Sequence, residues 1–172
     1  MRIESLIIDN LRAIGHLELT DLPPSGVIVI AGPNEQGKTT IMDALHLVLT
    51  EKHSSGKRLI QDMQPIGSDV GITISLGARL GPHRFTLTKS YLKDKGCTLA
   101  IHEPHVENLT GERAEVRLQE MLDEHLDRTL ARVLYMRQDA VSEREFEAAG
   151  ISSFASALAQ LHGADESPAQ SA

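Results

Sequence analysis

The sequence predicts an α/β fold, and three patterns along the chain support this prediction. An apolar, β-branched run over residues 27–31 is typical of a buried parallel strand. The segment that follows it, residues 39–50, carries apolar residues at helical spacing. Further along, residues 84–91 alternate between apolar and polar side chains, which suits an antiparallel sheet with one face toward solvent. We therefore expect helices packed on a sheet of mixed parallel and antiparallel strands, with an antiparallel β subdomain.

The first part of the chain is expected to form three strands, over residues 3–8, 17–19 and 27–31. The run Pro-Pro-Ser-Gly at residues 23–26 predicts the turn before the last of them. After the helix over residues 39–50, the chain is polar and rich in turn residues from 51 to 71, which predicts a long loop.

The second part is expected to form three more strands and then a helix. The strands cover residues 72–76, 84–91 and 98–102, with separators at 77–81 and 93–96. In the middle strand, Phe85, Leu87 and Lys89 share one side. The helix begins after Gly111, and its expected apolar stripe consists of Val116, Met121, Leu122, Leu126 and Leu130. Residues 163–172 are expected to be a disordered tail or the start of a linker.

Residues 32–40 read Gly-Pro-Asn-Glu-Gln-Gly-Lys-Thr-Thr and fit the phosphate-binding pattern G-x-x-x-x-G-K-[ST]. The glycines let backbone N–H groups wrap round a phosphate, Lys38 can reach the β and γ phosphates, and the Thr39 hydroxyl can ligate Mg²⁺. The pattern therefore predicts a nucleoside-triphosphate site for ATP and Mg²⁺. Its candidate contacts are Asn34, Glu35, Gln36, Gly37, Lys38, Thr39 and Thr40.

Composition favours one cytoplasmic domain. The chain has 172 residues, 41% of them hydrophobic, with no apolar run long enough to cross a membrane and no signal peptide. The lone Cys97 fits a reducing compartment and a small filler role in a strand. The net charge of −7 argues against general nucleic-acid binding. DNA contact would need other regions of the protein or a local patch such as Lys52, Lys57 and Arg58, and the same three residues are more typical of a solvated loop.

The phosphate loop lacks an evident catalytic partner in this chain. A triphosphatase needs a further acidic group for the metal and a base for the water, often at the end of an apolar strand after the loop. Asp9 ends an apolar run but precedes the loop, and no later apolar strand ends in a pair of carboxylates. The catalytic set is therefore expected to be incomplete.

The chain resembles the N-terminal half of an ABC-type ATPase head of the structural-maintenance-of-chromosomes (SMC) family, nearest to its SbcC, RecF and RecN-like branch. The residues that carry this resemblance are Asn10-Leu11-Arg12, the loop at 32–40, Met42-Asp43-Ala44, and Leu134 to Gln138, which looks like the family's Q-loop. It covers residues 1–162, taken here as one lobe of the head. It implies a P-loop sheet, an antiparallel β subdomain and the start of a helical arm that leads into a coiled coil.

The resemblance also implies roles for particular residues. Arg12 matches a position near the base and phosphates of the nucleotide. Gln138 matches the residue that, with Thr39, ligates Mg²⁺ and positions the attacking water, which makes Lys38 and Gln138 the catalytic candidates. The stretch from Met63 to Gly67, which contains Gln64 and Ile66, resembles a loop beside the nucleotide.

The partners implied by the resemblance lie outside this chain. A C-terminal half would carry the signature motif, the Walker B Asp and the catalytic Glu. Two complete heads would sandwich two ATP molecules, and hydrolysis would reopen the dimer. That cycle would act in DNA repair, recombination or chromosome maintenance, on DNA and with an associated nuclease, in the cytoplasm or at the nucleoid.

Other functions remain open on the sequence. One is a self-contained phosphotransferase in which Asp9 or Asp139 is the metal carboxylate. Another is a non-catalytic ATP-dependent interaction domain whose output is dimerisation. His102 and His105 could offer metal ligands, but Pro104 breaks any helix that would put them on one face.

Overall fold

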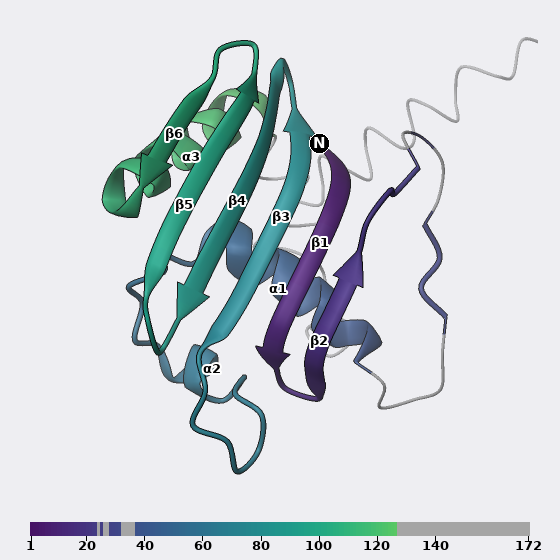
Figure 1. Ribbon diagram of the computed structural model, residues 1–172, viewed down its shortest axis with the longest axis vertical. Coiled ribbons are helices and arrows are strands. Elements are labelled where there is room, and N and C mark those ends of the chain that lie inside the picture. Colours follow the sequence, from purple (N-terminus) through teal and green to yellow (C-terminus); the bar gives the residue numbers. More distant parts are fainter. Residues whose placement is uncertain (24, 26–27, 32–36, 127–172) are drawn as a thin grey trace, which may run out of the picture. The chain divides into compact units, whose positions relative to one another are not determined.

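The computed structural model describes residues 1–23, 25, 28–31 and 37–126 (Figure 1). All of them lie in the first of two compact units, Met1–Leu126. The predictions made for residues 127–172, among them Gln138, Asp139, Leu130 and the tail, lie outside the described residues. The same holds for Asn34, Glu35 and Gln36 in the phosphate loop.

The described residues form a six-stranded sheet in the order β2-β1-β3-β4-β5-β6, and every pair in it is antiparallel. The strands are β1 (Arg2–Leu11), β2 (Ile14–Leu19), β3 (Ile72–Leu80), β4 (His83–Tyr91), β5 (Gly96–Glu103) and β6 (Glu107–Thr110). The helices are α1 (Lys38–Thr50), α2 (Arg58–Gln61) and α3 (Gly111–His125). The α/β class and five of the predicted strands are confirmed, and β6 is a further strand that the sequence did not predict.

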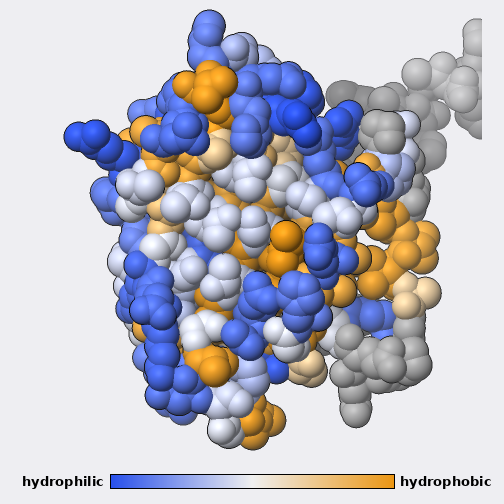
Figure 2. Space-filling view, in the orientation of Figure 1, coloured by the Kyte–Doolittle hydropathy of each residue, from blue (hydrophilic) through white to orange (hydrophobic). Residues whose placement is uncertain are grey.

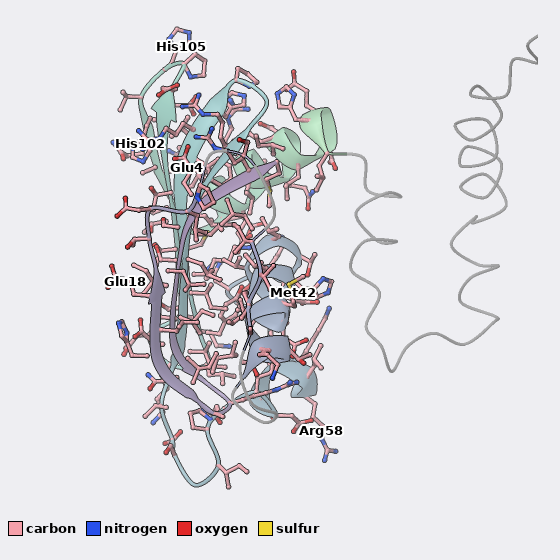
Figure 3. The ribbon with its side chains drawn as sticks, turned by 90° about the vertical axis from the view of Figure 1, so that its right-hand side faces the viewer. Glu4, Glu18, Met42, Arg58, His102 and His105 are labelled. Atoms are coloured by element: carbon pink, nitrogen blue, oxygen red, sulfur yellow. The ribbon has the colours of Figure 1, made fainter. Side chains whose placement is uncertain are left out.

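The long helices α1 and α3 pack on one face of the sheet (Figure 3). Helix α1 contacts β1, β3 and β4, while α3 contacts β3, β5 and β6. The core lies between these helices and the sheet, and its buried strand residues include Leu6, Ile8, Ile72, Ile74, Leu76, Phe85, Leu87, Leu99 and Ile101. Among the described residues, no helix is long and apolar enough to cross a membrane.

The opposite face of the sheet carries hydroxyl side chains. Thr73 and Ser90 lie 3.2 Å apart and Ser75 and Thr88 2.8 Å apart, each pair hydrogen-bonded across β3 and β4. Figure 2 shows this face, which is mostly pale or blue with smaller orange areas. The alternation over residues 84–91 therefore predicted the two faces of β4 correctly.

The separator expected at residues 77–81 is wrong, because β3 continues to Leu80. Gly77 lies within the strand opposite Ser5, where an added Cβ would come within 2.3 Å of the Ser5 Oγ. This glycine allows the close approach of two strands rather than a turn. The chain reverses after Leu80, where Gly81 has a φ of +55°.

The helix predictions hold for α1 and need one correction in α3. The apolar residues at helical spacing that predicted α1 are all buried: Ile41, Ala44, Leu45, Val48 and Leu49. In α3, Met121 and Leu122 are buried as predicted, but Val116 is 50% exposed. The buried stripe passes instead through Ala114, Glu115 and Leu118, one residue away from Val116.

The predicted strand over residues 27–31 is wrong for residues 28–31, which pair with no strand. Ile28, Val29 and Ile30 are 46, 79 and 41% exposed. The described sheet is wholly antiparallel and does not include this segment, so residues 28–31 have no hydrogen-bonded strand beside them in the described part of the chain.

Two histidines meet where α3 ends against the β3–β4 turn. The ring centroids of His83 and His125 lie 5.5 Å apart, and Gly81 makes room because a Cβ there would come within 2.8 Å of the His125 ring. His83 Nδ1 and His125 Nε2 are buried without a hydrogen-bond partner among the described residues. Burial lowers the pKa of His83, and the charge of Arg117 and the neighbouring His125 lower it further.

This geometry predicts a loss of stability in acid. The unfolded pKa of histidine is about 6.5, and that of folded His83 lies below it, so the unfolded chain binds more protons between the two values. The contribution of neutral His83 to the free energy of unfolding is fully present above pH ~6.5 and is lost as the pH falls toward the folded pKa. Melting temperatures at pH 7.5 and 5.0 should differ less for His83→Gln than for the wild type. The exposed His105→Gln should keep the wild-type difference, and an equal pH dependence in all three proteins would contradict the prediction.

Candidate nucleotide site

Helix α1 begins directly after a glycine with a left-handed backbone. Gly37 precedes the helix with φ 83° and ψ 15°, in the left-handed region, and no side chain caps the helix there. A Cβ at this position would also come within 3.0 Å of Ile14 Cγ1. Both observations favour glycine at this position. The N–H groups at the start of a helix favour an anion, so this end of α1 is suited to phosphate.

The three residues after Gly37 have different surroundings. Lys38 is half-buried, Thr39 is exposed and Thr40 is buried against the core. The motif assigns Thr39 to a metal ion, and its side chain is open to solvent. Thr40 faces the protein interior, where it supports the helix.

The turn between β1 and β2 brings Arg12 to α1. Asn10 and Arg12 have φ values of 58° and 51°, which place both in the left-handed region. The Arg12 N–H donates to the Met63 carbonyl at 2.7 Å, and its guanidinium Nη1 donates to Asp43 Oδ2 at 2.7 Å. Residues from three separate segments thus meet beside α1.

The loop after α2 is attached to the same turn. The Asn10 side chain donates to the Gly71 carbonyl at 3.2 Å, and the Gln64 amide donates to the Val70 carbonyl at 2.8 Å. Ile66 is fully exposed, next to Gly67 with a φ of 76°. The Gln64 side chain therefore joins the two ends of this loop, whereas the Ile66 side chain lies in solvent.

The alternative metal ligands within the described residues, Asp9, His102 and His105, do not gather around α1. Asp9 follows the buried Ile8 in β1, so its side chain points to the sheet face opposite α1, where it pairs with His16 at 2.6 Å. His102 bonds Thr86 at 2.9 Å, and Figure 3 shows His102 and His105 at the end of the sheet away from Arg58.

A hollow on the open sheet face contains a carboxylate held by two arginines. Its volume is about 600 Å³, and Arg2, Glu4 and Arg84 lie in its wall. Glu4 accepts from Arg84 at 2.9 Å and from Arg2 at 2.5 Å, and these bonds lower its pKa. The carboxylate is therefore already satisfied by its neighbours.

A second polar cluster lies in the core, beyond the last turn of α1. The ligand atoms of His53, Cys97 and Glu115 all lie within 4.8 Å of one another. Glu115 Oε2 accepts from the Lys89 ammonium at 2.8 Å, and Oε1 accepts from the His53 backbone N–H at 2.8 Å. Lys89 also donates to the Glu51 carbonyl at 2.9 Å. A cation bound here would lie against an ammonium that already neutralises Glu115, so the cluster does not suit a metal.

The protonation of this cluster follows from the same contacts. Burial raises the pKa of the Cys97 thiol to about 11, which agrees with its predicted filler role. Burial also opposes ionisation of Glu115, but the bonds from Lys89 and His53 outweigh it and lower the pKa of that carboxyl. The cluster is a buried ion pair that joins α1, β4 and α3, and the sequence did not predict it.

Comparisons with known proteins identify a family and several relatives. A family model described as an AAA domain matches residues 5–148. Uncharacterized proteins of Mycobacterium bovis and Mycobacterium tuberculosis are each 35% identical over 130 residues, covering 76% of this chain and 15% of the relative. The DNA replication and repair protein RecF of Prosthecochloris aestuarii is 29% identical over 102 residues, covering 59% of this chain and 23% of that protein. The chain thus spans a small part of each relative.

The fold also has a counterpart among solved structures. One from work on ATP-driven dimerization and DNA-stimulated activation of SMC ATPases matches with a TM-score of 0.53 and 16% identity. The match covers 85% of this chain and 96% of that chain. The predicted fold class and the resemblance to SMC and RecF-like ATPase heads are confirmed.

Proposed function

Because the chain belongs to the AAA domain family, whose model matches residues 5–148, we propose that it binds Mg²⁺-ATP as the N-terminal half of an SMC- and SbcC-like ATPase head. The observation that carries this proposal is the left-handed Gly37 at the start of α1, with Arg12 and the loop after α2 bonded beside it. This arrangement offers phosphate a helix N-terminus and two cationic side chains, Lys38 and Arg12.

The proposed contacts divide by chemistry. Backbone N–H groups of residues 34–37 and the Lys38 ammonium would hold the phosphates, and Thr39 and Gln138 would hold Mg²⁺, which stabilises the negative charge of the transferred phosphate. Arg12 would donate to the phosphates. Thr40 would support the phosphate-binding loop from the protein interior. Gln64 and Ile66 would lie beside the nucleotide.

The exposed segment over residues 28–30 supports an incomplete head. Three consecutive apolar residues in solvent are unfavourable, and a strand from another part of the protein would both bond and cover them. We propose that this strand belongs to a C-terminal half that also supplies the signature motif and the catalytic carboxylates. Two such heads would close on ATP and act on DNA in the cytoplasm, in repair, recombination or chromosome maintenance and with a nuclease partner.

The proposal is tested by calorimetric titration of the chain with Mg²⁺-ATP, together with a phosphate-release assay. We expect binding with almost no turnover, since positioning of phosphate does not require the missing base whereas hydrolysis does. No detectable binding would contradict the nucleotide site. Steady hydrolysis abolished by Lys38→Ala would instead contradict the half-head.

The phosphotransferase alternative now depends on Asp139, because Asp9 lies on the face away from α1. It predicts that Asp139→Asn costs more activity toward a small acceptor than Gln138→Ala. The interaction-domain alternative is tested by sedimentation with a non-hydrolysable ATP analogue. A monomer at all concentrations, with and without the analogue, would exclude ATP-driven dimerisation of this chain.

A further inference from the structure

We propose that Asp43 is a positioning residue of the nucleotide site. In this inference its carboxylate holds the Arg12 guanidinium beside the first turns of α1, so that the other guanidinium N–H groups can donate to phosphate. The inference rests on the proposed function, because it concerns how the same site is organised.

The backbone of Arg12 is already fixed before any ligand binds. Its φ of 51° is in the left-handed region, and its N–H is held by the Met63 carbonyl at 2.7 Å. Neighbouring Leu11 is completely buried. Only the long side chain of Arg12 can therefore change its conformation. That conformation decides whether the guanidinium can reach the phosphates.

Asp43 supplies that direction. It lies one helical turn after Thr39 and is buried, with a side chain only 7% exposed, whereas the Arg12 side chain is 34% exposed. A buried carboxylate requires a charged or hydrogen-bonding partner. The 2.7 Å bond from Arg12 Nη1 provides one. Because Asp43 is buried within a helix, the carboxylate is the fixed member of the pair and the arginine is the one that it orients.

The chemistry of the guanidinium allows two partners at once. It has five N–H donors in a planar fork, and the bond to Asp43 uses one of its terminal nitrogens. The remaining donors form a second edge that suits phosphate oxygens. A lysine at this position would have a single ammonium, and Asp43 would compete with the phosphate for it. Arginine is therefore favoured over lysine at position 12, because its guanidinium can bond Asp43 and phosphate at the same time.

Electrostatics alone predict the opposite result to this inference. A carboxylate near a triphosphate repels it, so removing the charge of Asp43 would strengthen binding if the residue had no positioning role. Under our inference the loss of arginine orientation exceeds this gain. The sign of the change in ATP affinity therefore distinguishes the two accounts.

The experiment is a double-mutant cycle in Mg²⁺-ATP affinity, measured by calorimetry on the 172-residue chain. Asp43→Asn and Arg12→Ala are each expected to weaken binding about tenfold, as for the loss of a hydrogen bond to a charged group. The double variant should lose no more than either single variant. Asp43→Glu, which restores the carboxylate on a longer side chain, should recover part of the loss.

Asp62→Asn is the matched control. Asp62 forms an exposed ion pair with Arg58 at 3.8 Å, and its replacement should leave ATP affinity unchanged. Circular dichroism of each variant without nucleotide reports folding separately from affinity. If Asp43→Asn fails to fold, Asp43→Glu measured with and without Arg12→Ala completes the cycle.

Three results would overturn the inference. Wild-type affinity or tighter binding in Asp43→Asn would leave the nucleotide site intact but remove the positioning role. Additive losses in the double variant would show that the two residues act independently. Absence of Mg²⁺-ATP binding by the wild-type chain would refute the proposed function, and the inference with it.

Discussion

Replacement of Lys89 by methionine is expected to lower the free energy of unfolding by about 3–5 kcal/mol. The side chains of Lys89 and Glu115 are 1 and 6% exposed, and their charged atoms lie 2.8 Å apart. Methionine fills a similar volume but leaves the Glu115 carboxylate buried without its cation, and the Glu51 carbonyl loses a donor. Urea denaturation followed by circular dichroism measures the change.

Two further variants test whether the loss of stability comes from the unpaired buried charge. Lys93→Met removes an exposed ion pair with Asp69 and should cost less than about 1 kcal/mol. Replacing both buried partners, as Lys89→Met with Glu115→Leu, should recover most of the stability, because neither charge is then left uncompensated. If Lys89→Met costs no more than Lys93→Met, the carboxylate is hydrated and the buried pair does not stabilise the fold as argued.

The same pair shows what periodicity can and cannot predict. Alternation in β4 placed Lys89 on the side of Phe85 and Leu87, and the structure buries all three. The helical stripe in α3 was misplaced onto Val116, although the buried position is Glu115. A hydrophobic pattern assigns a carboxylate to the surface. It cannot predict that a lysine from a distant strand neutralises the carboxylate and allows its burial.

The candidate site was predictable where the chemistry is local. The pattern of apolar residues predicted a helix over residues 39–50, and the structure begins α1 at Lys38, directly after a left-handed Gly37. The bond between Arg12 and Asp43 joins residues 31 positions apart, and only the tertiary fold brings them together. The error at residues 28–31 has a related cause, since a strand requires a neighbour that the described part of the chain does not supply.

Replacement of Lys38 by alanine is expected to weaken binding of Mg²⁺-ATP about 10- to 150-fold, the range for a hydrogen bond to a charged group. The helix N-terminus and Arg12 would remain, so residual binding should persist at high nucleotide concentration and decrease as salt is added.

Lys52→Ala is the control for loss of charge alone. Lys52 follows the other end of α1 and pairs with Glu112 at 2.7 Å in an exposed position, so its replacement changes the net charge equally without approaching the phosphates. Calorimetric titration of both variants, with circular dichroism to confirm folding, gives the comparison. Equal weakening by the two substitutions would show that the affinity comes from overall charge. Unchanged binding in Lys38→Ala would place the nucleotide elsewhere, because the motif positions no other ammonium at the start of this helix.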